Sequence, residues 1–149
     1  MVRKTIHRKA IVTHSCKEMY ALVSDIPSYN QFLPYCTAGF ILSSKGDIVN
    51  GKMVFSYFGL SYEVITKNTM SPHSRIGLSL IQGDMETLDG QWLFRDLKDG
   101  HCEVSLDLDL VMHDGLMYRV FNRIMDRLAD AMVDAFIDRS YQVYGLGED

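Results

Sequence analysis

Cysteine is scarce in this sequence. The chain has three cysteines in 149 residues, Cys16, Cys36 and Cys102, and none of them forms a CxxC pair. An odd number at scattered positions is typical of reduced thiols in a cytoplasmic protein and argues against a disulfide framework. No apolar run approaches the ~20 residues of a membrane-spanning helix, and the N-terminus has no signal-peptide core. We expect a cytoplasmic protein, with peripheral contact at the inner membrane left open.

Residue patterns of catalytic and metal sites are absent as well. The five histidines show no HxxxH or HExxH spacing, and no serine stands in a GxSxG turn after a strand. The tripeptide His101-Cys102-Glu103 lacks the PCxxC partner found in zinc deaminases. Asp107 and Asp109 lie on the strand face opposite a row of leucines, where we expect solvent rather than an acid–base pair. The sequence therefore predicts no catalytic residue, no metal ion and no enzyme activity.

Positive charge is in deficit. The chain has 15 Lys and Arg against 19 Asp and Glu, for a net charge of −4. Because nucleic-acid-binding domains are usually basic, we expect no DNA partner. One basic cluster stands out in RKTIHRK near the N-terminus, with Arg3, Lys4, Arg8 and Lys9. Its simplest interpretation is an edge strand that charged side chains keep from aggregating.

Hydrophobic periodicity predicts the secondary structure. Residues 5–12 fit a strand, and a capping box of Ser15 and Glu18 introduces a short helix over residues 16–24. Pro27 suits the first turn of a second short helix, which Pro34 ends. From Cys36 the apolar period is two, with turn signals such as Asn-Gly at residues 50–51. Six further strands are expected at residues 37–44, 52–58, 61–69, 74–81, 88–97 and 101–112.

A long amphipathic helix closes the chain at about residues 115–144. Its apolar stripe, at spacings of three and four, contains Met117, Phe121, Ile124, Leu128, Met132 and Ala135. Charged residues gather on the opposite side. The order of the elements predicts an α+β fold in which a curved antiparallel sheet of about seven strands surrounds the C-terminal helix. We expect one domain over residues 1–149.

The space between a curved sheet and a straight helix is where we expect a ligand pocket. The chain is rich in adaptable apolar side chains, with nine Met, eight Tyr, seven Phe and one Trp. The alternative is that these side chains only fill a core. Strand alternation and the helix stripe predict that the pocket is lined by Phe55, Tyr57, Trp92, Leu108, Phe121 and Leu128.

Three segments carry a family resemblance. LVSDIPSYNQFLPYC resembles the V-x-D-[VI]-x-x-Y-x-x-FLP-x-C segment of the coenzyme Q-binding, polyketide cyclase-like family. LIQGDMETLDGQWLF is similar to that family's L-x-x-G-x-x-x-x-L-x-G-x-W-x-F, and MVDAFIDRSYQVYG to its MV-x-AF-x-x-R-x-x-x-x-Y. The resemblance spans nearly the whole chain and implies a START-like helix-grip fold. The proline-bracketed first segment would then form a lid whose Phe32, Leu33 and Tyr35 face the pocket.

The resemblance implies three functions. The first is non-enzymatic binding of a hydrophobic small molecule, namely ubiquinone or another isoprenoid quinone in support of respiration, with transient contact at a membrane surface. The second is a ribosome-association toxin that binds the large ribosomal subunit and blocks subunit joining. Phosphate contacts would come first from the N-terminal basic cluster and next from Arg119, Arg123 and Arg127. The third and weakest is a cyclase or dehydrase acting on a polyketide or aromatic substrate.

Overall fold

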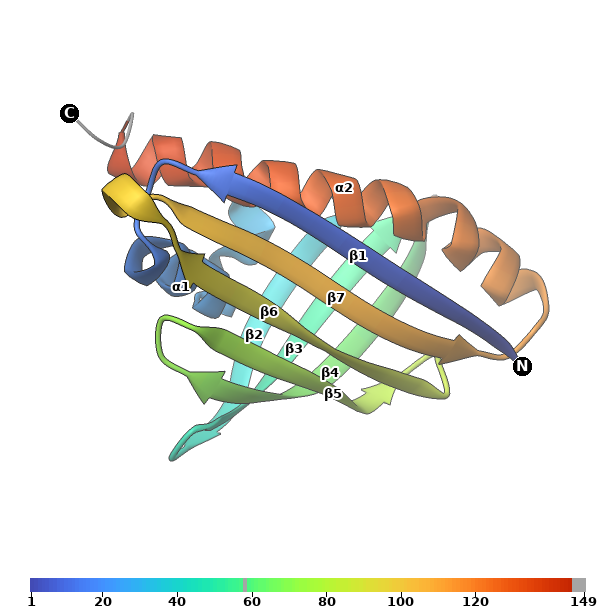
Figure 1. Cartoon of the computed structure of the whole chain (residues 1–149). Helices are drawn as coiled ribbons and strands as arrows, with labels where there is room; N and C mark the ends of the chain where they lie inside the picture. Colours follow the sequence, from blue (N-terminus) through green and yellow to red (C-terminus); the bar gives the residue numbers. More distant parts are fainter. Residues whose placement is uncertain (58, 146–149) are drawn as a thin grey trace.

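An antiparallel sheet curves around a long C-terminal helix (Figure 1). The computed structural model describes residues 1–57 and 59–145, except the side chains of Met117, Val120, Phe121 and Ile124. Within these residues the strands are β1 (Val2–Val12), β2 (Cys36–Lys45), β3 (Ile48–Tyr57), β4 (Leu60–Ser71), β5 (Arg75–Gly83), β6 (Thr87–Asp96) and β7 (Cys102–Met112). The helices are α1 (Cys16–Ser24), η1 (Ile26–Gln31), η2 (Lys98–Gly100) and α2 (Leu116–Tyr144).

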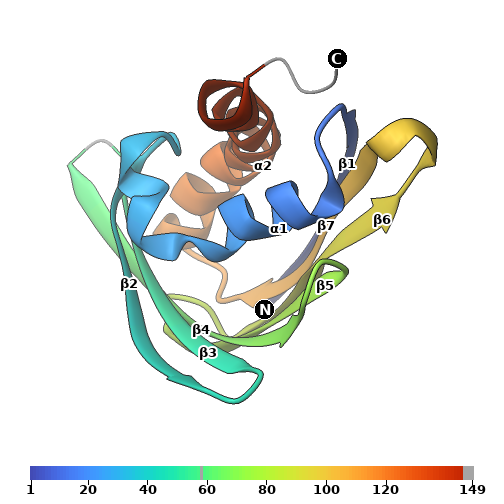
Figure 2. The same cartoon turned by 90° about the vertical axis from the view of Figure 1, so that its left-hand side faces the viewer.

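The strands of the described residues follow the order β1-β7-β6-β5-β4-β3-β2, and each pairs antiparallel with its neighbour. Viewed from one end, the sheet is a deep trough, with α1 and η1 near one end and α2 along the opening (Figure 2). The predicted α+β class and the curved sheet around a C-terminal helix are therefore confirmed. None of the described helices is long and apolar enough to span a bilayer.

The predicted capping box begins α1. The Ser15 hydroxyl accepts the backbone N–H of Glu18 at 3.1 Å, and the Glu18 carboxylate accepts the backbone N–H of Ser15 at 3.0 Å. The helix ends at Ser24, as expected. The second short helix, η1, is a 3₁₀ helix with Pro27 in its first turn, and it ends at Gln31. Because both helices are short, their stability depends on packing over the trough.

One predicted turn is wrong. The sequence places a hairpin turn at Asn50-Gly51, but β2 and β3 pair from Lys45 and Ile48 around a two-residue loop at Gly46-Asp47. Gly46 has φ of +61°, a conformation that glycine adopts without steric cost. Gly51 lies inside β3 instead, where a Cβ atom would stand 2.5 Å from the Cδ1 atom of Ile26 in η1. Its small size therefore serves packing rather than a turn.

The long helix α2 covers the trough with an apolar face. Met125, Leu128, Ala129, Val133 and Phe136 are buried in the described part of this face. The charged residues lie on the exposed side, as the periodicity predicts. The predicted stripe residues Met117, Phe121 and Ile124 have side chains outside the described part, so the stripe is established from residue 125 onward.

The thiol prediction is wrong for two of the three cysteines. Cys16 at the start of α1 and Cys102 at the start of β7 form a disulfide, with Cα atoms 5.0 Å apart. Cys36 is free and buried. The paired cysteines are separated by 86 residues, so spacing along the chain gives no sign of their contact. They meet because α1 packs across the end of the trough where β7 begins.

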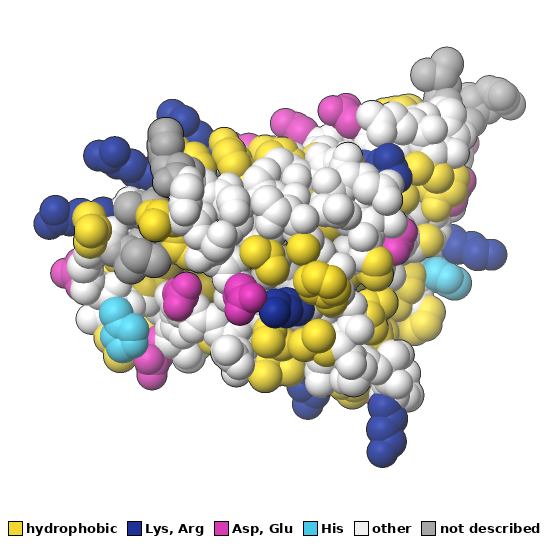
Figure 3. Space-filling view, turned by 180° about the vertical axis from the view of Figure 1, so that it is seen from behind, with side chains coloured by type: hydrophobic (Ala, Val, Ile, Leu, Met, Phe, Trp, Pro, Cys, Tyr) yellow, Lys and Arg dark blue, Asp and Glu magenta, His cyan; other side chains and the backbone are white. Residues whose placement is uncertain are grey.

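The two edges of the sheet differ. The edge strand β1 lies beside α2, and Lys4 and Arg8 form ion pairs with Asp126 and Asp130 of that helix. The interpretation of the N-terminal basic cluster as a charged edge strand is confirmed. The other edge, β2, exposes Phe40, Ile41 and Leu42. Seen from behind, hydrophobic side chains gather on the molecule around a few charged ones (Figure 3).

Candidate functional site

A cavity of about 110 Å³ lies inside the trough, which we call the central cavity. Side chains from α1, η1, β3–β7 and α2 surround it. Its wall is apolar except for Tyr29, Thr66 and Asn68, and it includes four methionines, Met53, Met85, Met125 and Met132. Methionine side chains are flexible and polarisable, so this wall can adapt to the shape of a guest.

Three of the predicted pocket residues line the central cavity. They are Phe55 of β3, Trp92 of β6 and Leu108 of β7. Strand alternation places all three on the concave face, which is why the sequence could identify them. Their contact with a ligand stays a prediction.

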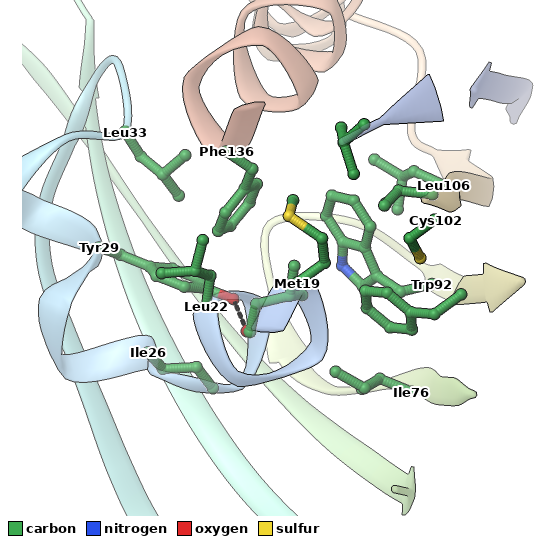
Figure 4. Close-up of a cluster of buried hydrophobic side chains, with 14 of the residues drawn as sticks. Met19, Leu22, Ile26, Tyr29, Leu33, Ile76, Trp92, Cys102, Leu106 and Phe136 are labelled. Carbon is green, nitrogen blue, oxygen red and sulfur yellow. Dashed lines mark hydrogen bonds between the residues drawn. The ribbon is translucent and has the colours of Figure 1, made fainter. Parts of the chain in front are cut away.

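Phe136 of α2 is at the centre of a group of aromatic side chains in the core. Its ring stands between Tyr29 and Trp92, with ring centroids 5.5 Å and 5.4 Å away (Figure 4). The Tyr29 hydroxyl donates a hydrogen bond to the carbonyl of Val23, and burial raises the pKa of Tyr29 far above its usual range. This phenol is therefore a neutral structural group and not an acid or base for catalysis.

The lid segment, residues 26–35, does not face the central cavity in the way predicted. Leu33 is buried in the hydrophobic core, and Phe32 is only partly buried and packs on the ring of Phe136. Tyr35 is 40% exposed and adopts a left-handed backbone conformation with φ of +64°. That conformation turns the chain into β2 and directs the Tyr35 ring onto Tyr57, at 5.3 Å between centroids. Phe32, Leu33 and Tyr35 do not line the central cavity, and their contact with a ligand stays a prediction; in the lid segment, Ile26 and Tyr29 line it.

Two further predicted lining residues lie elsewhere. Tyr57 is the last residue of β3 and contacts Tyr35 beyond the end of the central cavity. Leu128 is buried in the core, whereas Met125 and Met132, about one turn before and after it on α2, reach the cavity. Helix periodicity predicted which face of α2 is buried, but not which residues of that face line the central cavity. The side chain of Phe121 lies outside the described residues.

The sequence analysis missed two polar residues, Thr66 and Asn68 of β4. They are 3% and 6% exposed and both border the central cavity. The Thr66 hydroxyl donates a hydrogen bond to the Asn68 Oδ1 atom at 2.7 Å. Alternation along β4 carries the signal, because Tyr62, Val64, Thr66 and Asn68 occupy successive buried positions. A polar pair in that register marks a polar spot in an apolar wall.

The charged side chains divide into paired and unpaired groups. Arg3 forms a two-point ion pair with Asp109, with Nε–Oδ1 and Nη2–Oδ2 distances of 2.9 and 2.7 Å. This pairing holds the pKa of Asp109 below its usual range. Lys4 and Arg8 are bound to α2, as described above. Four arginines belong to α2, and Arg139 among them donates a hydrogen bond to Gln31. The other three form what we call the arginine row, Arg119, Arg123 and Arg127.

The arginine row runs along the exposed side of the first half of α2. All three residues are exposed, and none forms an ion pair with the described residues. A spacing of four places them along one side of the helix. Asp130, Asp134 and Asp138 continue on the exposed side toward the C-terminus. Apart from Asp126 and Arg139, the arginines of α2 therefore lie in its first half and the exposed aspartates in its second half.

The fold agrees with solved structures. The structure of a START superfamily protein from Mycobacterium smegmatis matches with a TM-score of 0.79 and 19% identity, covering 93% of this chain and 98% of that one. The Zhui aromatase/cyclase from a Streptomyces species matches with a TM-score of 0.83 and 12% identity, covering 95% and 96% of the two chains. At these identities the likeness shows the fold alone, and it confirms the START-like helix-grip prediction.

Curated relatives are more similar in sequence. The ribosome association toxin RatA of Vibrio cholerae is 33% identical over 142 residues, which cover 95% of this chain and 99% of the relative. RatA of Escherichia coli is 35% identical over 144 residues, covering 97% and 91%. The family model described as polyketide cyclase / dehydrase and lipid transport matches residues 12–137. Since that match spans most of the helix-grip fold, the chain belongs to the polyketide cyclase / dehydrase and lipid transport family.

Proposed function

We propose that the protein associates with the ribosome, binding the large subunit and opposing subunit joining. The observation that carries this proposal is the identity of 33% and 35%, over nearly the full length, with two proteins named ribosome association toxin. The sequence analysis ranked this function second to quinone binding, and the relatives reverse that order. A ribosomal partner would place the protein in the cytoplasm.

Electrostatics indicate which surface would meet the ribosome. Ribosomal RNA presents phosphates, and arginine binds phosphate oxygens through paired N–H donors. The arginine row offers three exposed guanidinium groups that have no acidic partner among the described residues. In the N-terminal basic cluster, by contrast, Arg3, Lys4 and Arg8 are already neutralised by aspartates. We therefore place the arginine row first and the N-terminal cluster second.

The positions of the arginine-row residues make the isolated α2 helix less stable. This supports a role for these arginines other than in folding. Arg119 is the fourth residue of α2, close to the positive end of the helix dipole, where a cation is unfavourable. Arginines spaced four apart also repel each other, by a few tenths of a kcal/mol per pair. A bound polyanion would reverse the penalty at the basic end.

Sedimentation tests the proposal. Purified protein is mixed with separated large and small ribosomal subunits and run through sucrose gradients at low and high salt. We expect co-migration with the large subunit that weakens steeply with salt, because phosphate contacts release counterions. Equal binding to both subunits, or no co-migration at low salt, would contradict the proposal.

A second candidate function is binding of a hydrophobic small molecule, which the apolar wall of the central cavity favours. The volume of about 110 Å³ limits the guest. An apolar cavity of ~150 Å³ holds benzene, and sites for drug-sized ligands measure roughly 300–1,000 Å³. The cavity is smaller than both, so an isoprenoid tail does not fit, and a single small ring fits only if the methionine side chains of the wall shift. A ubiquinone would enter only if the lid segment moved.

Fluorescence of Trp92 tests this second candidate, because Trp92 is the one tryptophan of the chain and lines the central cavity. We expect its emission to change on titration with a short-chain ubiquinone. An unchanged spectrum, with calorimetry also showing no binding, would argue against quinone binding. Among the described residues the cavity wall has no carboxylate and no imidazole, which supports binding over cyclase or dehydrase chemistry.

A further inference from the structure

We propose that Asn68 is a hydrogen-bond donor that selects small cyclic ligands with one acceptor atom, such as a ring ketone, in the central cavity. The inference rests on the second candidate function, ligand binding in that cavity. It adds the polar contact and the chemical class of the guest.

The geometry of β4 fixes the Asn68 amide. Because the Thr66 hydroxyl donates to Asn68 Oδ1 at 2.7 Å, the carbonyl side of the amide is occupied. The Nδ2 group, with two N–H donors, points away from that bond. Among the side-chain hydrogen bonds of the described residues, Asn68 takes part in this one through Oδ1, and none is donated by Nδ2. The side chain is only 6% exposed, and it borders the central cavity.

The surroundings leave the Nδ2 group accessible from the cavity. Gly51 faces it across the strand pair, and a Cβ atom at Gly51 would stand 3.8 Å from Nδ2. The absence of that side chain keeps space beside the donor. The neighbouring wall is apolar, formed by Ile26 above and Leu78 on the next strand. A buried donor without an acceptor is unfavourable, so an acceptor on a guest would be bound selectively.

Water is a poor substitute at this position. A buried water is held by two to four polar partners. The polar side chains of the cavity wall are Thr66, Asn68 and Tyr29, and the hydroxyls of Tyr29 and Thr66 already donate to protein atoms. A guest that places one acceptor against Asn68 and an apolar ring against the methionines matches both features of the wall.

The cavity volume sets the ring size. A cavity of ~150 Å³ accommodates benzene, so about 110 Å³ admits at most one six-membered ring, and the flexible methionine side chains of the wall must shift to admit it. A site built to hydrogen-bond a guest discriminates strongly against an analogue that lacks the polar atom, because its buried group is then left unpaired. The selectivity should therefore appear between two rings of equal shape.

The test compares cyclohexanone with methylenecyclohexane, which replaces C=O by C=CH2 and keeps the shape. NMR titration of the wild-type protein gives both affinities and follows the side-chain NH2 signals of Asn68. We expect cyclohexanone to bind about tenfold more tightly, with a downfield shift of those signals. In Asn68→Leu the order should reverse, because the buried ketone then has no hydrogen-bond donor while methylenecyclohexane needs none, so methylenecyclohexane binding should be retained. Asn50→Leu, the same change on the outer face of β3, should keep the preference.

The possible outcomes distinguish the proposed role of Asn68 from ligand binding in the central cavity. Equal binding of both rings to the wild-type protein would overturn the Asn68 proposal and leave the second candidate function standing. Failure of both rings to bind would overturn both. Preference for cyclohexanone in Asn68→Leu would also overturn the proposal, because another donor would be responsible. The wild-type comparison needs no variant, so it decides the question even if Asn68→Leu fails to fold.

Discussion

Phe32 of the lid segment packs edge to face on Phe136 of α2, with ring centroids 5.3 Å apart. The guanidinium of Arg139, also of α2, lies 5.1 Å from the Phe32 ring centroid. The lid segment is therefore attached to the long helix rather than suspended over the central cavity. Any opening for a guest must break this contact.

The first prediction is that Phe32→Ala loosens the lid segment. A fully buried phenylalanine costs roughly 3–5 kcal/mol on truncation, but Phe32 is only partly buried, so we expect about 1–2 kcal/mol. Hydrogen exchange should accelerate in residues 26–35 and stay slow in the sheet. Phe40→Ala, at an exposed position of β2, is the matched control. Global unfolding of Phe32→Ala would show that the segment belongs to the core and is not a separable lid.

A second prediction contrasts two glycines beneath Ile26. A Cβ atom at Gly39 would overlap the backbone carbonyl of Ile26, whereas one at Gly51 would meet only the end of the Ile26 side chain. Gly39→Ala should therefore displace η1 and lower the free energy of unfolding by about 2–3 kcal/mol. Gly51→Ala should cost less than about 1 kcal/mol, because the side chain can rotate away. Chemical denaturation measures both. Equal losses would mean that the contact with η1 does not decide the cost.

The third prediction concerns the disulfide. Cys16 and Cys102 close a loop with a sequence separation of 86, for which chain entropy gives about 4.6 kcal/mol of stabilisation. The cytoplasm keeps thiols reduced. If the protein binds the ribosome there, it must also fold without the disulfide. We expect reductant to lower the melting temperature while the protein remains folded. Cys36→Ala should keep this response, and Cys16→Ser/Cys102→Ser should abolish it. A melting temperature independent of reductant would show that the bond does not form in solution.

A fourth prediction follows from the Arg3–Asp109 pair. Arg3 holds the pKa of Asp109 below its usual value of about 3.9. A carboxyl whose folded pKa is lowered stabilises the fold above its unfolded pKa and loses that effect as pH falls through the folded value. NMR titration should show Asp109 titrating below the usual range, and Arg3→Gln should raise its midpoint toward 3.9. Arg95→Gln, which removes the partner of Glu103, should leave Asp109 unchanged. A midpoint insensitive to Arg3→Gln would contradict the pairing.

Local signals in the sequence were sufficient for much of the fold. The capping box at Ser15 and Glu18 placed the start of α1, and strand alternation put Phe55, Trp92 and Leu108 on the concave face. These features depend on near neighbours in the chain. The prediction of a turn at Asn50-Gly51 was wrong because Gly46, four residues before Asn50, forms the loop instead.

Contacts between distant segments could not be read from the sequence. The partner of Cys16 lies 86 residues away, and Phe32 turned to Phe136 rather than to the central cavity. Pairing of Arg3 with Asp109 across β1 and β7 likewise depends on strand register. Because Arg3 is already paired with an aspartate, we expect the phosphate contacts at α2 rather than at the N-terminus. Thr66 and Asn68 were missed because the search for a pocket followed apolar residues only.

Binding of the large ribosomal subunit by arginine-row variants is the most direct test of the proposed function. The triple variant Arg119→Gln/Arg123→Gln/Arg127→Gln is compared with Lys17→Gln/Lys45→Gln/Lys98→Gln, which removes the same charge from exposed positions elsewhere. Affinity is measured across a salt series. We expect the arginine-row variant to lose at least about tenfold in affinity and to reduce the salt slope by about 2–3, while the control stays close to wild type. Unchanged binding by the arginine-row variant, with the control weakened instead, would contradict the assignment of this helix face to the ribosome.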